Sequence, residues 1–352
     1  MKKILVLSRY DTLAASSRQR FKLYERSLLN NGFELDIKPL FTNLYLKRIF
    51  SRKKTNLFGI ILSYLKRFSI ILTAGRYDIV WLQYEAFPYL PSFTERILPL
   101  INKNIVCDFD DAIFHKYDDW GGFLTKKILG KKLNSVIINS RQVICGNQYI
   151  EDWARQFSNN TIIVPTVVCC ERYTQSAPKN QSDILIGWIG SPATWCYVEP
   201  YVDLLRNLAK QYEFKILIIG SGFSINDRNF IFRDWSEDTE ISNLHEIDIG
   251  IMPLIDDKWA NGKCGYKIIQ YMATSTPVIA SPVGVNSKII THNQNGFLAN
   301  TEQEWSEYII RLAKDSKLRK SMGDIARKNI QDYYSLDSQD ERIIKLFHSI
   351  LK

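Results

Sequence analysis

Short apolar runs alternate with longer segments in which apolar and polar residues recur at helical spacing. This alternation is typical of βαβ units that build parallel sheets. In the first half it predicts strands at residues 3–8, 33–39, 79–83, 104–108, 142–146 and 162–168, and helices at residues 17–30, 58–73, 92–101 and 124–139. In the second half it predicts strands at residues 184–189, 214–219, 249–253 and 277–281. Helices are predicted up to residue 211 after a loop at 190–194, and at residues 239–246, 266–273, 306–315, 318–334 and 336–352.

The same rhythm restarts after a polar, irregular segment near residue 175, which indicates two doubly wound α/β domains. A chain of 352 residues is long enough for two cores. We expect an N-terminal domain at residues 1–170, a linker at 171–182 and a C-terminal domain at 183–334. The last helix, residues 335–352, is a candidate to pack back on the N-terminal domain.

Composition indicates a soluble globular protein, with 45% hydrophobic and 24% charged residues. The six cysteines form no Cys-x-x-Cys pair and mostly lie in apolar runs, so we expect free buried thiols in a reducing cytoplasm. The basic and then apolar start resembles a signal peptide, but Arg9 and Asp11 end the apolar run early, so a first strand is expected instead. No window offers 18 uncharged apolar residues, so no membrane span is expected.

Positive charge is concentrated in one segment. Between Ile37 and Tyr77 there are nine basic residues and no acidic one, which equals the formal excess of +9 for the whole chain. Bulky apolar residues are interleaved with these charges over residues 44–72, a pattern that favours docking on an anionic membrane surface. The alternatives are a core helix with a solvated basic edge and a nucleic-acid patch. No zinc spacing or RNP-type aromatic motif accompanies the segment, so nucleic acid is not an expected partner.

The most informative stretch is residues 261–286, where a glycine-containing loop leads into a short helix and then a buried strand. A helix N-terminus that follows a glycine loop can bind an anion through its unpaired N–H groups. Lys263 and Lys267 flank this N-terminus, where the helix dipole does not favour cations, so we expect them to face a bound anion. The alternative is an ordinary loop of an α/β domain.

This stretch resembles the donor-binding signature of family 4-type glycosyltransferases, which have the GT-B fold and include bacterial enzymes of surface-polysaccharide synthesis. The match covers Gly265, Tyr271-Met-Ala273, Pro277-Val-Ile-Ala280 and Gly284. Residues 187–194, 164–168, 248–254, 295–298 and 322–327 extend it, so that residues 143–335 carry the resemblance best. It departs at the two glutamates of the signature, which fall on Gly262 and Gln270.

The resemblance implies two Rossmann-like domains facing a central cleft, a UDP- or GDP-linked sugar as donor substrate, and no metal or other cofactor. A retaining mechanism is implied as well. Gln270 can still bind ribose through its amide, but Gly262 cannot hold a sugar. The donor-binding residues expected from the motifs and their loops are Gly190, Ser191, Thr194, Gly220, Gly222, Lys263, Cys264, Gly265, Tyr266, Lys267 and Gln270. For Ser191 and Thr194, simple helix capping is the alternative.

Three carboxylates follow a strand of the first domain, and Asp108 and Asp110 alternate to one face of it. We expect Asp108, Asp110 and His115, with Lys267, to be catalytic, while Asp111 contributes to acceptor binding. Metal ligation and a solvated turn are the alternatives for the three carboxylates. Arg18 and Arg20, in the first helix, suit a diphosphate of the donor or of a lipid-linked acceptor, although solvated helix charges explain them equally well.

The sequence therefore predicts a cytoplasmic glycosyltransferase, peripheral on the inner face of the membrane. It would transfer a sugar from a nucleotide sugar to a lipid-linked or growing glycan acceptor in cell-surface polysaccharide synthesis. The absent acidic pair favours one alternative, an inactive nucleotide-sugar-binding partner. A nucleotide-sugar epimerase of the same fold is another.

Overall fold

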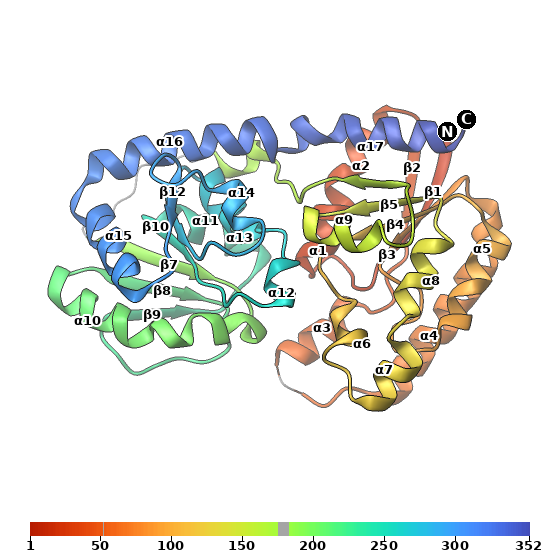
Figure 1. Cartoon of the computed structure of the whole chain (residues 1–352), viewed down its shortest axis with the longest axis horizontal. Coiled ribbons are helices and arrows are strands. Elements are labelled where there is room, and N and C mark those ends of the chain that lie inside the picture. Colours follow the sequence, from red (N-terminus) through yellow and green to blue (C-terminus); the bar gives the residue numbers. More distant parts are fainter. Residues whose placement is uncertain (52, 175–182) are drawn as a thin grey trace. The chain divides into compact units, whose positions relative to one another are not determined.

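The structure is a computed structural model that describes residues 1–51, 53–174 and 183–352. Its contacts divide the chain into two units (Figure 1). The first unit comprises residues 1–166, 261–264 and 339–352, and the second comprises residues 167–260 and 265–338. Of the expected linker, residues 175–182 lie outside the described part of the chain.

The first unit is built on a parallel sheet with strand order β2-β1-β3-β4-β5-β6. Its strands are β1 Lys2–Leu7, β2 Phe33–Ile37, β3 Ile79–Gln83, β4 Ile105–Phe109, β5 Gln142–Cys145 and β6 Thr161–Ile163. Strands β3 and β4 are buried along their whole length because helices cover both faces, as expected for a parallel sheet. The order reverses beside β1, so the sheet has its topological switch point between β1 and β3.

The helices of the first unit are short, except for α4. They are α1 Ala15–Arg20, α2 Glu25–Asn30, α3 Asn43–Phe50, α4 Leu57–Leu72, α5 Ile97–Ile101, α6 His115–Asp118, α7 Phe123–Leu129, α8 Lys132–Ile138 and α9 Gln148–Ala154. Most of α17, Leu336–Ile350, also belongs to this unit. Phe347 of α17 is fully buried there, with its ring centroid 5.0 Å from that of Trp81 on β3.

The second unit repeats the architecture with strand order β12-β11-β10-β7-β8-β9. Its strands are β7 Leu185–Ile189, β8 Lys215–Ile219, β9 Phe230–Arg233, β10 Ile249–Met252, β11 Val278–Ala280 and β12 Gly296–Leu298. Its helices are α10 Val202–Tyr212, α11 Glu237–Glu246, α12 Lys258–Asn261, α13 Tyr266–Ala273, α14 Asn286–Ile289, α15 Glu302–Lys314 and α16 Ser316–Tyr333. Asn261, the last residue of α12, counts with the first unit.

Alternate residues of the central strand β7 enter two different cores of the second unit. Leu185 and Ile189 pack in the core that contains α13 and α16. Ile186 and Trp188 pack in the core that contains α10 and α15. The continuous apolar run of β7 therefore reflects burial on both faces of the sheet.

Several predicted elements are interrupted. The helix predicted at residues 17–30 breaks at Phe21, whose backbone is not helical and whose fully buried ring packs edge-on against Trp81. The helix predicted at 124–139 divides into α7 and α8 around Gly130. The strand predicted at 162–168 is limited to Thr161–Ile163, and Pro165 follows it closely.

Candidate functional site

The loop after β7 is shaped by Gly190 in the second unit. A Cβ on Gly190 would lie 2.2 Å from the Trp188 ring and 2.8 Å from Oγ1 of Thr194, so only glycine fits. Ser191 then caps the short helix at Pro192–Tyr197, and its backbone N–H donates to Oγ1 of Thr194 at 3.1 Å. Both hydroxyls take part in this capping box, so capping accounts for their positions.

Lys267 lies against this loop. It is the second residue of α13, and its Nζ donates to Oγ1 of Thr194 at 3.2 Å. The same Nζ lies 4.6 Å from the centroid of the Trp188 ring, in cation–π contact. The residue before α13, Gly265, has φ of +67°, and a Cβ there would overlap Ile289. The structure therefore places a cation between the capped loop after β7 and the N-terminus of α13, an arrangement that suits a diphosphate.

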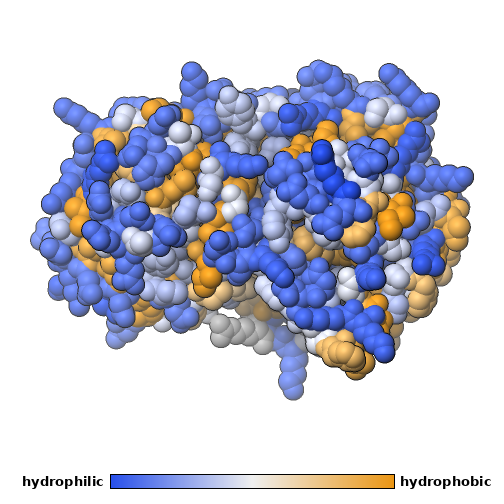
Figure 2. All heavy atoms as spheres, in the orientation of Figure 1, coloured by the Kyte–Doolittle hydropathy of each residue, from blue (hydrophilic) through white to orange (hydrophobic). Residues whose placement is uncertain are grey.

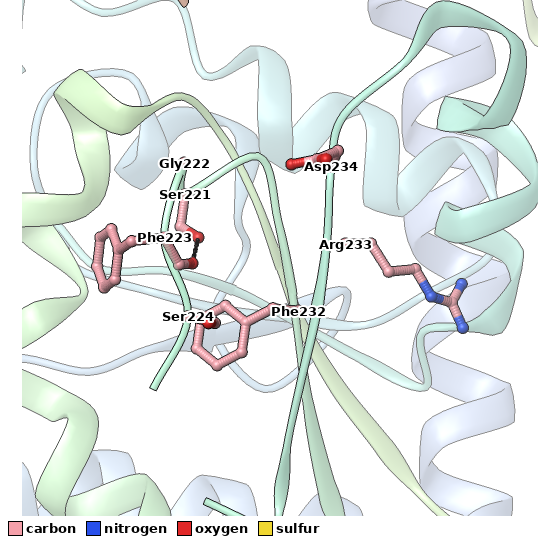
Figure 3. A pocket seen from close by; sticks show the side chains of 7 residues that line it. All are labelled: Ser221, Gly222, Phe223, Ser224, Phe232, Arg233 and Asp234. Atoms are coloured by element: carbon pink, nitrogen blue, oxygen red, sulfur yellow. Dashed lines mark hydrogen bonds between the residues drawn. The ribbon is translucent and has the colours of Figure 1, made fainter. Parts of the chain in front are cut away.

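The loop after β8 carries Gly220 and Gly222, with φ of +81° and +76°. A Cβ on Gly220 would lie 2.4 Å from the carbonyl oxygen of Gly190, so glycine allows the loops after β7 and β8 to touch. Beside this loop is an open cavity of about 270 Å³, lined by Ser221, Gly222, Phe223, Ser224, Phe232, Arg233 and Asp234 (Figure 3).

The side chains that line this cavity are aromatic and polar. Oγ of Ser221 donates to the carbonyl of Phe223 at 2.6 Å, which fixes the turn of the loop. The ring centroids of Phe223 and Phe232 lie 6.4 Å apart. Arg233 points away from the other lining side chains in Figure 3, because its guanidinium pairs with Glu246 at 2.6 Å.

Two other residues of the expected donor signature are partly or wholly inside the second unit. Tyr266 is half-buried against one of its cores. Gln270 is buried, and its Nε2 donates to the Tyr173 hydroxyl at 3.4 Å. This contact engages only Nε2 of Gln270, and ribose binding by its amide stays a prediction.

In the first unit, Asp108 and Arg20 form a buried ion pair. The guanidinium donates to Oδ1 of Asp108 from Nη2 at 2.8 Å and from Nε at 3.1 Å. Indole N–H of Trp81 donates to Oδ2 of Asp108 at 3.1 Å. Their side chains are only 1–2% exposed. Each side chain neutralises the charge of the other inside the fold, and a catalytic role of Asp108 and diphosphate binding by Arg20 stay predictions.

Arg18 and His115 also have structural positions. Nη1 of Arg18 donates to the carbonyls of Thr12 and Leu13 at 2.8 and 3.0 Å and thereby holds the loop before α1. His115 is 7% exposed, with Nδ1 3.1 Å from Asp118 and Nε2 2.8 Å from the Tyr149 hydroxyl. These contacts occupy Nη1 of Arg18 and both ring nitrogens of His115. Phosphate binding by Arg18 and a catalytic role of His115 stay predictions.

Asp110 and Asp111 lie beside residues 261–264, which count with the first unit. The Tyr84 hydroxyl donates to Asp110, and the Cys264 thiol donates to the Asp110 carbonyl at 2.7 Å. Burial raises the pKa of Asp111 to about 6; nearby Lys263 opposes this rise, while Asp110 adds to it. Burial also raises the pKa of the Cys264 thiol, which suits a packing role.

Asn147, which was not among the residues expected from the sequence, anchors this segment. Its Nδ2 donates to the carbonyls of Gly262 and Lys263, both at 3.0 Å, while its Oδ1 caps α9 through the N–H of Ile150. An Asn directly after a buried strand and before a helical pattern was the available signal. The expected donor signature is thus divided, with Lys263 and Cys264 in the first unit and Gly265 to Gln270 in the second.

Metal binding was an alternative role for the three carboxylates at Asp108, Asp110 and Asp111. In the described ranges 1–51, 53–174 and 183–352, no three His, Cys, Asp or Glu side chains come together in a group that could hold a metal ion. The carboxylates of Asp108 and Asp110 are instead engaged by Arg20, Trp81 and Tyr84.

Residues 171–329 match the family model described as glycosyl transferases group 1. Two curated relatives are similar in sequence. An uncharacterized glycosyltransferase of Methanocaldococcus jannaschii is 25% identical over 201 residues, 53% of each chain. The N-acetyl-alpha-D-glucosaminyl L-malate synthase of Bacillus anthracis is 22% identical over 167 residues, 44% of this chain and 41% of the relative. The chain thus matches about half the length of these relatives or less.

Solved structures with a similar fold cover nearly the whole chain. Sucrose-phosphate synthase of Thermosynechococcus elongatus has a TM-score of 0.72 at 13% identity and 99% coverage of both chains. HepE of Anabaena, in complex with UDP and glucose, has a TM-score of 0.72 at 14% identity, covering 99% of this chain and 100% of that one. WaaG, a glycosyltransferase involved in lipopolysaccharide biosynthesis, has a TM-score of 0.67 at 14% identity, covering 98% and 99%. The two-domain GT-B fold and the resemblance expected from the sequence are confirmed.

Proposed function

We propose that this chain, a GT-B glycosyltransferase with a glycosyl transferases group 1 domain at residues 171–329, uses a nucleotide sugar as its donor. It transfers the sugar, with retention of configuration, to a lipid-linked or growing glycan in cell-surface polysaccharide synthesis. The proposal is based on the position of Lys267, whose ammonium lies between the capped loop after β7 and the N-terminus of α13.

The donor diphosphate would bind at Lys267. Its leaving oxygen gains negative charge as the glycosidic bond breaks, and a preorganised cation stabilises that charge in the transition state. The cation–π contact with Trp188 and the bond to Thr194 hold the ammonium in place before the donor arrives. Anabaena HepE, of the same fold, was crystallised with UDP and glucose, which supports a nucleoside diphosphate as the leaving group.

We assign the nucleoside to the cavity beside Gly222. Phe223 and Phe232 offer aromatic surface to a base, and the exposed carboxylate of Asp234 can accept from ribose hydroxyls. The loop after β8, which lines this cavity, touches the loop after β7, which Lys267 contacts. UDP- and GDP-linked donors both remain candidates.

The membrane part of the proposal rests on an exposed apolar surface of the first unit. Leu57, Phe58 and Leu65 of α4 are 61–70% exposed, and Phe123 and Leu124 of α7 are 68–80% exposed. Figure 2 shows hydrophobic residues at the surface in the region of α4 and α7. The adjacent basic residues of α3 and of the segment that follows it favour an anionic lipid surface. We therefore place the enzyme on the inner face of the cytoplasmic membrane. In the part of the chain that is described, no helix is both long and apolar enough to cross a bilayer.

The direct test is nucleotide release. The full chain is incubated with a panel of UDP- and GDP-sugars and with membrane lipid as acceptor, and thermal shift is measured with UDP and GDP. Release of one nucleoside diphosphate that depends on the lipid supports the proposal. Binding without release would instead favour an inactive nucleotide-sugar-binding partner, the alternative suggested by Gly262 and Gln270. If the chain neither binds a nucleoside diphosphate nor releases one, the proposal is wrong.

A further inference from the structure

The switch point of the first sheet has no role in the proposed donor chemistry. It lies between β1 and β3, and the loops that leave these strands are residues 8–12 and 84–90. In open parallel sheets the carboxyl edge at the switch point is where ligands bind, because the two loops diverge there.

The loop after β3 is held in an unfavourable backbone conformation. Tyr84 and Tyr89 have φ of 60° and 59°, in the left-handed region that side chains other than glycine rarely adopt. Buried Glu95 fixes the loop by accepting from the N–H groups of Ala86 at 2.8 Å and Phe87 at 3.0 Å. Strain that the surroundings enforce in this way is typical of binding sites.

Within the loop, Glu85 shares one lysine with Glu95. Nζ of buried Lys132 lies 2.7 Å from Oε2 of Glu85 and 3.2 Å from Glu95. The Tyr117 hydroxyl donates to Oε1 of Glu85 at 2.7 Å. Because the single charge of Lys132 cannot balance two carboxylates, a second cation completes this cluster.

Arg9, on the opposite loop, is this second cation, but its ion pair with Glu85 is too long for a hydrogen bond. Its N–H donates to Oε1 of Gln83 at 2.9 Å, which fixes its backbone at the end of β1. Its guanidinium lies 5.7 Å from the ring centroid of Tyr10 and 5.9 Å from that of Tyr89. The nearest carboxylate oxygen, on Glu85, is 3.8 Å from Nη1, beyond hydrogen-bond distance.

The hydrogen-bonding capacity of Arg9 is incompletely used. The side chain is 10% exposed, and over residues 1–51, 53–174 and 183–352 its buried Nε finds no acceptor. Burying a guanidinium donor without an acceptor is costly, so a ligand acceptor would stabilise this arrangement. Burial lowers the pKa of neighbouring Lys116, and the positive charge of Arg9 lowers it further, so two cations share this region.

We propose that Arg9, with the rings of Tyr10 and Tyr89, binds an anionic sugar of the glycosyl acceptor. The guanidinium pairs with an oxyanion, a phosphate or a carboxylate, and the exposed face of Tyr89 packs on the attached sugar ring. Tyr89 is 56% exposed and so remains accessible to such a ring. This inference rests on the proposed function, since it names the class of acceptor that the transferase uses.

The test is ligand-observed NMR titration of the full chain, with UDP present in excess to fill the donor site. The probes are glucose 1-phosphate, glucuronate and neutral methyl glucoside. We expect the first two probes to bind. Arg9→Ala should lower the affinity for both by roughly tenfold or more, the typical effect of losing a charge-assisted hydrogen bond. Arg9→Lys should recover only part, because the fork of donors is lost. Arg26→Ala, which removes an exposed arginine of α2, is the matched control.

Tyr89→Ala and Tyr89→Phe provide a second check. Tyr89→Ala, which removes the ring, should weaken binding of the sugar phosphate. Tyr89→Phe should retain the affinity because the face of the ring is kept. Preference for glucose 1-phosphate would identify a phosphate acceptor, and preference for glucuronate a carboxylate acceptor. Equal binding of anionic probes to wild type and Arg9→Ala, with both proteins folded, would overturn the inference.

The two proposals fail separately. If UDP does not bind, the donor proposal fails, and the same probes without UDP still test Arg9. If UDP binds and donor turnover proceeds but Arg9→Ala leaves the anionic probes unaffected, only the acceptor site is wrong.

Discussion

Gly262 lies at a position where the packing leaves no room for a side chain. The first glutamate of the resembled signature falls at this position, yet a Cβ here would lie 2.2 Å from the Cβ of Ala112. The Asn147 amide holds the Gly262 carbonyl at 3.0 Å, so the backbone cannot easily move away. A glutamate would not fit this segment as it is folded.

We therefore expect Gly262→Ala to destabilise the first unit by about 1–3 kcal/mol, the usual effect of overpacking a filled site. The measurement is denaturant unfolding of the full chain. Adding Ala112→Gly should restore part of the loss, because it removes the closest atom while the nearby backbone of Ala112 remains. A fully stable Gly262→Ala protein would show that the segment relaxes freely.

The stability of the protein should depend on pH through the ionisation of Asp111. Burial raises its pKa from the usual carboxylate range to about 6, so the folded state holds this proton more tightly than the unfolded state does. Its contribution to stability is therefore lost as pH rises from about 4 to 6. Asp111→Asn should raise the melting temperature relative to wild type more at pH 7 than at pH 4.5. A gain that is larger at pH 4.5 would show that Lys263 and Lys116 dominate instead.

At the level of residues, the sequence predicted that Lys267 lies at a helix start after a glycine loop, and the structure has it there. It could not locate the partners of Asp108, since Arg20 lies 88 positions away and the pair forms only when α1 meets the sheet. Arg9, Glu85 and Lys132 were missed for the same reason, because their contacts join separate loops and a helix.

At the scale of elements, α3 and α4 combine exposed apolar and basic residues. Seven large apolar residues of α4 are at least 41% exposed, namely Leu57, Phe58, Ile61, Leu62, Leu65, Phe68 and Leu72. Only Arg67 and Ile71 of this helix are buried. Of the alternatives for residues 44–72, a core helix with a solvated edge does not fit this exposure.

We expect neutralising Lys47, Arg48, Arg52, Lys53 and Lys54 to release the protein from anionic vesicles. Each contributes about 1 kcal/mol near an anionic surface, so together they supply several kcal/mol. Arg52 itself lies outside the described residues. Vesicle sedimentation is the measurement. Neutralising five exposed basic residues of the second unit, namely Lys210, Arg228, Lys288, Lys317 and Lys328, is the matched control.

Raised salt should release the wild type only in part, because salt screens the charges but not the apolar contacts. Leu57→Ser with Phe58→Ser and Leu65→Ser should remove the salt-resistant part. Wild-type protein that never sediments with vesicles would contradict a membrane role for this surface.

Element boundaries followed from the sequence where apolar runs are unambiguous. The strand at Ile79–Gln83 and the helix at Tyr266–Ala273 were predicted with the bounds observed. Strands β9 and β12 were missed; both are short edge strands of the second sheet, and three of the four residues of β9 are only partly buried. Breaks such as the one at Phe21 depend on tertiary packing against Trp81, which local patterns do not report.

At the scale of the molecule, two parallel sheets were predictable because βα alternation restarts after the polar segment, although only four of the six strands of the second sheet were predicted. The contact units refine this picture, since residues 261–264 and 339–352 return to the first unit. Such exchanges of chain between units depend on long-range contacts, including those of Asn147 with Gly262 and of Phe347 with Trp81.

Turnover should survive chelation by EDTA, because Lys267 and the helix N-termini can stabilise the leaving diphosphate electrostatically. The measurement is the initial rate of nucleotide release with EDTA, with Mg²⁺ and with Mn²⁺. Loss of activity on chelation with rescue by either cation would contradict this and point to Asp110 and Asp111 as metal ligands.

In the proposed reaction, the chain transfers a sugar from a nucleotide-sugar donor whose diphosphate binds at Lys267. The most direct measurement is incorporation of radiolabelled sugar from the donor into membrane lipid by wild type, Lys267→Ala and the exposed-residue control Lys288→Ala. We expect incorporation by wild type and control, and a loss of roughly 10²-fold or more for Lys267→Ala, typical of removing one preorganised group that stabilises developing charge. Incorporation by Lys267→Ala at the wild-type rate would show that Lys267 does not bind the donor diphosphate.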